Sequence, residues 1–203
     1  MNILKLFLIL FSFLFLSTGS FSKEDFEFPK NEYKQLAGKE FLDFRMIDES
    51  GNVVHLKDFV NKHKPVVIVF WAIGDQKGTY WFLPEFNKLY EKYKDKVIFL
   101  AVLLSRSTPK EVQEAKKFIP LKIPVYRAYS EAIERYKIAK IDVPYIVLIT
   151  PEGKIKRIMI RPESYTRYEE PRQPLTKKTK LEDIIAESIQ KLDKYIKELI
   201  KGE

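Results

Sequence analysis

The stretch of sequence that decides the fold is Val66-Val-Ile-Val-Phe-Trp-Ala-Ile-Gly-Asp-Gln-Lys-Gly-Thr79. It opens with six apolar residues without polar alternation, as expected for a β-strand that is covered on both faces of a sheet. The residues after Ile73 are small or polar, and they predict a loop at the end of this strand. From Trp81 to Lys94, apolar residues recur at helical spacing. The stretch therefore predicts a buried strand, a loop and a helix in succession.

The segments on either side predict further strands and helices in alternation. Before the stretch, residues 41–48 and 53–56 are predicted to form a hairpin, with turn residues at Glu49–Asn52. A short helical turn is expected over residues 57–61. After the stretch, the pattern predicts a strand over 97–104 and then a helix from Pro109 to about 118, capped by Thr108. An extended piece over 123–126 and a second helix, capped by Ser130 and ending near 137, are expected next. Two more strands are predicted over 145–150 and 155–160. This order is typical of an α/β fold with a central mixed sheet flanked by helices.

The rest of the chain completes the predicted domain organisation. Residues 1–22 carry one Lys, an apolar run and then small residues, which predicts a secretory signal peptide, with an uncleaved N-terminal anchor as the alternative. Residues 23–36 are predicted to be a loose polar lead-in to one domain over residues 37–203. Within it, residues 161–179 contain three prolines and predict an irregular loop that is either functional or disordered. Residues 180–201 are predicted to form an amphipathic C-terminal helix.

The charge of the chain bears on its partners and location. The formal net charge is +8, but the cations are interleaved with acids, as in Glu91–Lys96. Such interleaving indicates a solvated surface, so we expect no nucleic-acid partner. The signal peptide predicts an exported protein, periplasmic or otherwise extracytoplasmic. Contact with a membrane is expected only if the N-terminal segment remains uncleaved as an anchor.

The composition also excludes several reactions, because the 203-residue chain has no cysteine. Thiol-disulfide exchange and thiol peroxidase chemistry both need a thiolate. The two histidines, His55 and His63, lack metal-ligand spacing with each other and have no recognisable place beside a serine nucleophile. We therefore expect no catalytic residue, no metal and no cofactor.

Four short motifs occur in the order and spacing of one known family. They are the turn at Gly51, Phe70-Trp71-Ala72, Leu83-Pro-Glu-Phe-Asn-Lys-Leu-Tyr90 and Ile141-Asp-Val-Pro-Tyr145. Over residues 38 to about 160, and in its final helix, the chain resembles the thioredoxin-fold superfamily. The resemblance is to its exported TlpA/ResA-like branch and to the neighbouring peroxiredoxin-like AhpC/TSA group. It implies a thioredoxin-like fold with an N-terminal β-hairpin and a C-terminal amphipathic helix.

The chain departs from this family at the active-site loop. Family members carry two cysteines shortly after Phe-Trp-Ala. Counting forward from Phe70 puts Asp75 and Gly78 in those places, whereas counting back from Pro84 puts Gln76 and Thr79 there. The loop therefore has about one extra residue, and its alignment stays open.

The resemblance further implies which residues form a binding face. It implies a cis peptide bond between Val143 and Pro144, lying against the loop, with the neighbouring backbone offered to an extended peptide. The expected partner-binding residues are Trp71, Asp75, Gln76, Lys77, Gly78, Thr79, Trp81, Val143, Pro144 and Tyr145. For Asp75 and Thr79, the alternative is that they only stabilise the start of the following helix.

These observations predict a redox-inactive exported protein that binds an envelope protein or extended peptide through this degenerate face. Two alternatives remain open. One is the thiol-disulfide oxidoreductase or antioxidant activity that the family implies. The other is a structural subunit of an envelope assembly, held by residues 161–179.

Overall fold

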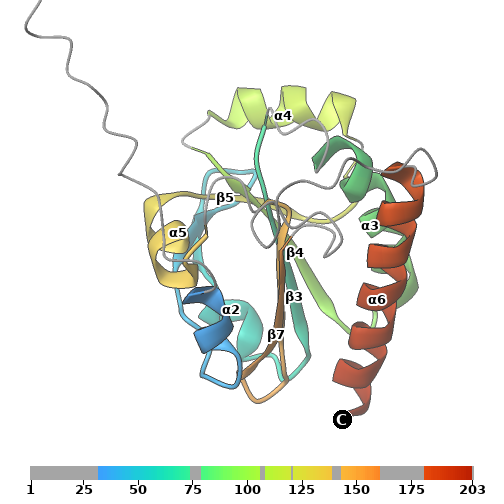
Figure 1. The fold of residues 1–203 in the computed structure, drawn as a ribbon. Helices are drawn as coiled ribbons and strands as arrows, with labels where there is room; N and C mark the ends of the chain where they lie inside the picture. Colours follow the sequence, from blue (N-terminus) through green and yellow to red (C-terminus); the bar gives the residue numbers. More distant parts are fainter. Residues whose placement is uncertain are drawn as a thin grey trace, which may run out of the picture.

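The structure is a computed structural model that describes residues 32–73, 79–105, 108–119, 121–138, 143–160 and 181–202. Its centre is a seven-stranded sheet with the strand order β2-β1-β5-β4-β3-β6-β7. The strands are β1 (Arg45–Ile47), β2 (Val53–His55), β3 (Val66–Trp71), β4 (Ile98–Leu104), β5 (Val125–Ala128), β6 (Tyr145–Ile149) and β7 (Ile155–Ile160). The helices are η2 (Glu32–Leu36, a 3-10 helix), α2 (Lys57–Val60), α3 (Thr79–Tyr93), α4 (Pro109–Phe118), α5 (Ser130–Tyr136) and α6 (Leu181–Lys201). Figure 1 shows α3 and α6 on one side of this sheet and α2 and α5 on the other. The predicted α/β architecture with a flanked mixed sheet is confirmed.

The register of the sheet explains why it is mixed. Strands β3, β4 and β5 run parallel, whereas β6 and β7 are antiparallel to their neighbours β3 and β6. The β1–β2 hairpin joins the opposite side of the sheet, where Ile47 pairs with Arg127 of β5. The carboxyl ends of β3, β4 and β5 therefore lie at one end of the sheet, together with the beginning of β6 and the end of β7.

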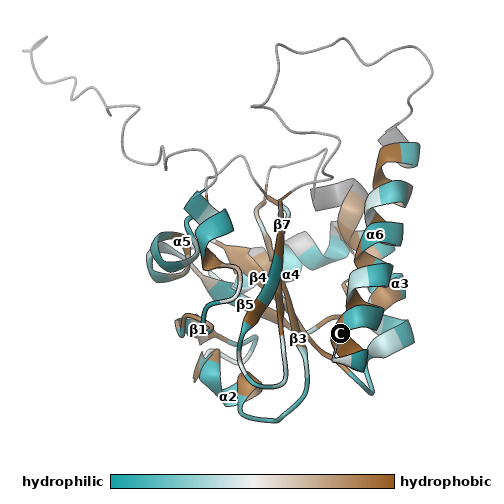
Figure 2. Ribbon diagram, turned by 60° about the horizontal axis from the view of Figure 1, so that its bottom comes forward, coloured by the Kyte–Doolittle hydropathy of each residue, from teal (hydrophilic) through white to brown (hydrophobic). Residues whose placement is uncertain are grey.

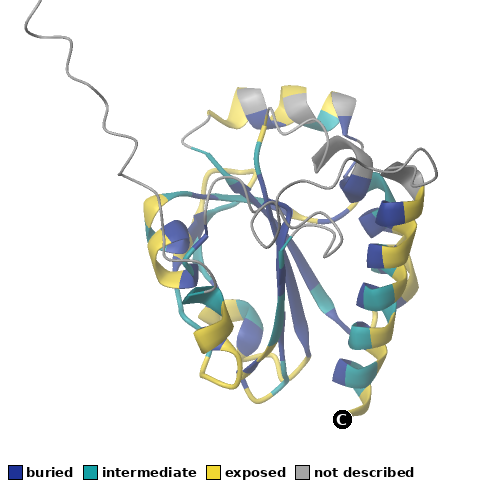
Figure 3. Cartoon of the chain, in the orientation of Figure 1, coloured by how far each residue is buried: buried dark blue, intermediate teal, exposed yellow. Residues whose placement is uncertain are grey.

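Both faces of the sheet carry a hydrophobic core, because successive residues of a strand point to opposite faces. Val67, Val69 and Trp71 belong to the core on which α3 and α6 pack. Val66, Ile68 and Phe70 belong to the second core, which includes residues of η2, α2 and α5. Figure 3 shows the buried residues on the sheet and on the inner sides of the helices. The continuous apolar run of β3 is thus explained by burial on both faces.

Some predicted boundaries are wrong for identifiable reasons. β1 has three residues rather than the eight predicted, because the chain before it hydrogen-bonds elsewhere: Phe41 N–H donates to the Gly153 carbonyl. Ser130 does not cap α5; it is the first helical residue, and Tyr129 holds the cap position without a side-chain hydrogen bond.

The lead-in predicted to be loose contains η2, in which Leu36 is buried. The predicted signal peptide (1–22) and the irregular loop (161–179) lie outside the described residues. The described helices include none with the length and apolar content needed to cross a membrane. Helix α6 is amphipathic: its apolar residues pack on the core, and polar residues occupy its other side (Figure 2).

Candidate functional site

The expected binding face lies at the end of the sheet where β3 ends and β6 begins. Phe70 pairs with Tyr145 in the antiparallel β3–β6 ladder, so Trp71 and Ala72 follow directly opposite the Val143–Pro144 segment. The Val143–Pro144 peptide bond is cis, and both residues are buried. Thr79 is the first residue of α3. The structure thus brings the end of β3 and the Pro144 segment together, whereas residues 75–78 and the side chains of Thr79 and Trp81 lie outside the described part.

The structure describes the side chains of four of the residues expected to line this face, and all four are buried: Trp71, Val143, Pro144 and Tyr145. Trp71 and Tyr145 each have 0% of their surface exposed. The pleat of the paired strands sends Trp71 into the core beneath α3 and α6, and Tyr145 into the core on the opposite face. The prediction that these aromatic side chains offer apolar contact to a partner is therefore wrong.

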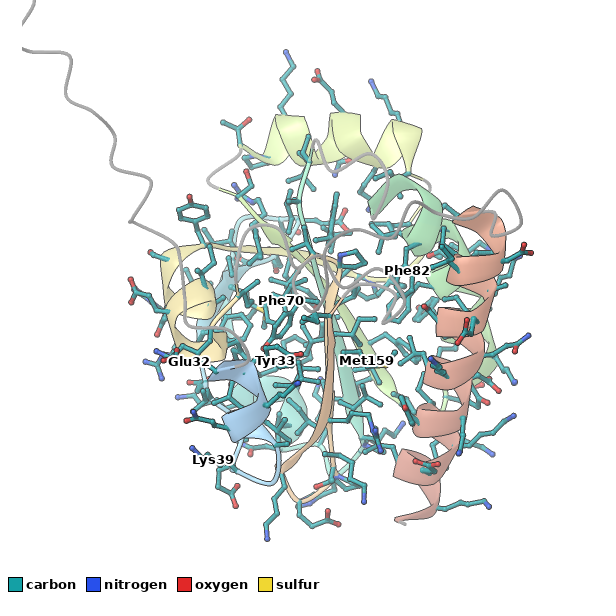
Figure 4. All side chains as sticks on the ribbon, in the orientation of Figure 1. Glu32, Tyr33, Lys39, Phe70, Phe82 and Met159 are labelled. Carbon is teal, nitrogen blue, oxygen red and sulfur yellow. The ribbon has the colours of Figure 1, made fainter. Side chains whose placement is uncertain are left out.

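Tyr145 is held by a set of aromatic residues that sequence reasoning missed. Its hydroxyl donates to the Tyr136 carbonyl over 2.7 Å, and its ring meets the rings of Phe70 and Tyr33 edge to face. Figure 4 shows Tyr33 and Phe70 on the same side of the sheet. Tyr33 is one of three aromatic residues in a mostly polar lead-in, with Phe26 and Phe28, and periodicity does not single it out. The first residue of β6 is therefore fixed from η2, α5 and β3.

Tyr136 links the hairpin segment to the same set of rings. Its hydroxyl accepts a hydrogen bond from Leu42 N–H over 3.1 Å, and its ring packs against Phe44 and Phe70. Burial raises the pKa of Tyr136 well above its ordinary value, so this hydroxyl remains protonated at any physiological pH. Tyr136 therefore joins the segment before β1 to α5 through a neutral hydroxyl.

Trp71 brings one unpaired donor to this end of the sheet. Its indole Nε1–H is buried, and within the described part of the chain it has no hydrogen-bond partner. A buried donor without a partner costs about 1–3 kcal/mol, so an acceptor from a water or a ligand would stabilise this end of β3.

The groups open to a partner here are few. Ile73, two residues beyond Trp71, is 43% exposed and is one of two large apolar side chains described as exposed; the other is Val53. Val143 is buried in the second core, so its backbone is not exposed to solvent. The described residues at this end provide apolar surface, and their tyrosine side chains lie in or against the second core: Tyr136 and Tyr145 are buried, and Tyr33 packs against them.

The histidines lie outside this face. His55 of β2 places Nδ1 3.1 Å from Oδ2 of Asp43, and His63 lies in the turn after α2 with a left-handed φ of 54°. Across the described residues, no three His, Asp or Glu side chains gather in a way that could hold a metal ion.

Comparison with known proteins relates this chain to redox proteins. The model of the AhpC/TSA family matches residues 37–158. The thiol-disulfide oxidoreductase ResA of Bacillus cereus (strain ATCC 10987 / NRS 248) is 34% identical over 138 residues, which are 68% of this chain and 72% of that protein.

Solved structures show the same fold. A putative thiol-disulfide oxidoreductase from Bacteroides vulgatus is 28% identical, with a TM-score of 0.50 over 61% of this chain and 85% of that one. The thioredoxin domain of another thiol-disulfide oxidoreductase from the same organism is 23% identical, with a TM-score of 0.52 over 77% of this chain and 96% of that one. The fold is therefore thioredoxin-like, while the cysteine chemistry in these proteins' names has no thiol to use in this chain.

Proposed function

The chain belongs to the AhpC/TSA family, and on that premise we propose that it is an exported, redox-inactive member that binds an extended segment of an envelope protein. The observation that carries this proposal is the complete absence of cysteine from a chain that keeps the thioredoxin-like scaffold. A thiolate is the nucleophile of both disulfide exchange and thiol-dependent peroxide reduction. What such a scaffold retains without thiols is its capacity to hold a polypeptide.

The end of the sheet around Val143 is where the partner segment would pair. Backbone pairing supplies affinity in strand-addition complexes, and side-chain pockets supply specificity. The exposed Ile73 supports contact with such a segment, whereas Val143 is buried and would pair only after the residues that cover it move. The loop residues 75–79 and Trp81 complete the proposed face. Trp71 and Tyr145 would not contact the partner. Because they are buried, they hold the ends of β3 and β6 in position.

Export is supported by the N-terminal sequence. One Lys precedes an apolar run and a group of small residues within residues 1–22. Expression of the full chain with a tag at the C-terminus, followed by mass determination of the exported product, would test both export and cleavage. A product that keeps Met1 would favour the anchor, and retention in the cytoplasm would contradict export.

The binding proposal is tested by site-specific photo-crosslinking in the native envelope. A crosslinking amino acid replaces Ile73 in one variant and Val53 in a matched control, since both side chains are exposed and apolar but only Ile73 lies at the proposed face. We expect a discrete adduct from position 73, weakened by Pro144→Ala, and none from position 53. Equal adducts from both positions, or none from position 73, would contradict the proposal.

The oxidoreductase alternative is tested separately by insulin reduction. Purified protein with dithiothreitol is expected to reduce insulin no faster than dithiothreitol alone. Insulin reduction clearly faster than with dithiothreitol alone would show that the protein promotes disulfide reduction without thiols of its own.

A further inference from the structure

The outer edge of β7 is partly occupied by the protein's own chain. β7 is the last strand of the sheet, and only one of its sides pairs with β6. On its free side, Ile155 N–H donates to the Lys39 carbonyl over 2.8 Å, and Gly38 N–H donates to the Ile155 carbonyl over 2.7 Å. The segment before β1 therefore covers the beginning of this edge.

Along the remainder of this edge, the backbone groups of two further residues, Ile158 and Ile160, face away from β6. The Ile155 side chain lies in the second core, and Ile158 and Ile160 pack against that same core, whereas Met159 lies in the core beneath α6. In a strand the direction of the backbone groups alternates together with the side-chain face. A register shift opposite Leu148 and Ile149 adds one residue to β7 between Ile155 and Arg157. Ile158 and Ile160 therefore share the side-chain face of Ile155 and direct their N–H and C=O groups outward, as Ile155 does. In the described structure, no backbone hydrogen bond meets these outward groups.

The charge along this edge restricts what can pair with it. Lys156 is exposed and has no ion-pair partner among the described residues. The Arg157 guanidinium lies 3.9 Å from the centre of the Tyr195 ring of α6, which holds its charge beside the same strand. Lysines on edge strands disfavour pairing with another basic or neutral strand. A second copy in antiparallel pairing would bring the cations of the two edges together, and opposed like charges are destabilising.

We propose that the edge of β7 from Lys156 to Ile160 accepts an extended acidic segment of a protein partner by strand addition. The partner's backbone pairs with Ile158 and Ile160, and its carboxylates lie beside Lys156 and Arg157. Two outward residues span about 7 Å of strand, so a segment of four to six residues suffices. Ile160 pairs with Tyr145, so this edge adjoins the Val143 face, but pairing with Ile158 and Ile160 does not depend on binding at that face.

The test uses the full exported chain and two synthetic peptides, an acetylated and amidated Glu-Val repeat of six residues and its Lys-Val counterpart. Backbone amide resonances are followed during titration, with the Val143 amide as an internal reference for the other face. We expect saturable shifts and slower hydrogen exchange at Ile158 and Ile160 with the acidic peptide, and no saturable shift with the basic one. Shifts at Val143 alone, equal shifts with both peptides, or no shift at Ile158 and Ile160 would overturn the inference.

Two variants test the charge and the backbone separately. Lys156→Glu should weaken the acidic peptide about fivefold, while Lys110→Glu on α4, also an exposed lysine, should leave the affinity unchanged. Ile158→Pro removes an outward N–H at an edge position that tolerates proline, and it should abolish the slower exchange at Ile160. If Ile158→Pro fails to fold, the comparison of the two lysine variants decides: equal affinities would overturn the inference.

Discussion

The rings of Tyr33 and Tyr145 meet edge to face, with centroids 6.0 Å apart and planes inclined at 76°. Tyr33 belongs to η2, which precedes the family match at residues 37–158, and Tyr145 is the first residue of β6. A residue outside the family's common core therefore supports the strand that begins beside Pro144. The lead-in is part of the folded domain from Glu32 onward.

Replacing Tyr33 should measure this support. Tyr33→Ala is expected to lower the free energy of unfolding by about 1–2 kcal/mol, because it removes an aromatic pair and its buried surface. Tyr33→Phe keeps the ring and should retain most of that stability. Urea denaturation of both variants provides the measurement. An equal loss in the two variants would show that the hydroxyl, and not the ring contact, is responsible.

Gly153→Ala should destabilise the turn between β6 and β7 more than Gly51→Ala destabilises the hairpin turn. Both glycines have left-handed φ values, +86° and +90°, so both substitutions carry the same backbone strain. A Cβ at position 153 would lie 3.2 Å from Cδ1 of Phe41, whereas the space at position 51 is open. We expect an additional loss of about 1 kcal/mol at position 153, measured by thermal unfolding. Equal losses would mean that Phe41 moves aside without cost.

Asp193 should make the stability depend on acid pH. Partial burial raises the pKa of this carboxyl, but hydrogen bonds from Lys197, Lys92 and Tyr93 outweigh that effect and lower the pKa to about 2. A group with a lowered folded pKa stabilises the protein above its unfolded pKa and loses that contribution as the pH falls toward the folded value. Asp193→Asn is therefore expected to cost about 1–2 kcal/mol at neutral pH and to flatten the loss of stability between pH 4 and pH 2.

The control for this prediction lies on the same helix. Asp183 is exposed in the first turn of α6, where a carboxylate gains about 0.3–1 kcal/mol from the positive end of the helix, so Asp183→Asn should cost less stability at neutral pH than Asp193→Asn. If the two variants have the same free energy of unfolding at every pH, the hydrogen bonds from Lys92 and Tyr93 of α3 to Asp193 of α6 do not stabilise the fold.

His63→Gly should stabilise the protein. His63 is exposed and adopts φ of 54°, a left-handed conformation that strains a residue with a Cβ and suits glycine. The expected gain is about 0.5–1 kcal/mol in the free energy of unfolding by urea. His63→Ala keeps the strain and should give no gain, so a similar gain in both variants would attribute the effect to loss of the imidazole.

Much of the fold was predictable from local patterns. The apolar run of Val66–Trp71, the helix beginning at Pro109 and the strand Ile155–Ile160 form as predicted, because runs, periodicity and proline placement act over a few residues. The strand before Gly51 was predicted too long, since its beginning bonds to Gly153, a partner more than 100 residues away. Local pattern carries no information about such a partner.

The candidate site was predictable only as a location. The end of β3 and the Val143–Pro144 segment do meet, as the resemblance implied, but the exposure of Trp71 and Tyr145 was predicted wrongly. Which face of a strand is covered depends on the helices that pack on it, and both faces are covered here.

The sequence by itself determined the chemistry that is closed to this protein: without a cysteine no thiolate forms, whatever the fold. It also determined the order of strands and helices, since these follow from short-range periodicity. Only the tertiary structure decided that Trp71 and Tyr145 are buried on opposite faces, that Tyr33 supports β6, and that Ile158 and Ile160 turn their backbone groups outward. These outcomes depend on strand register and on contacts between distant segments, and such contacts exist only once the chain has folded.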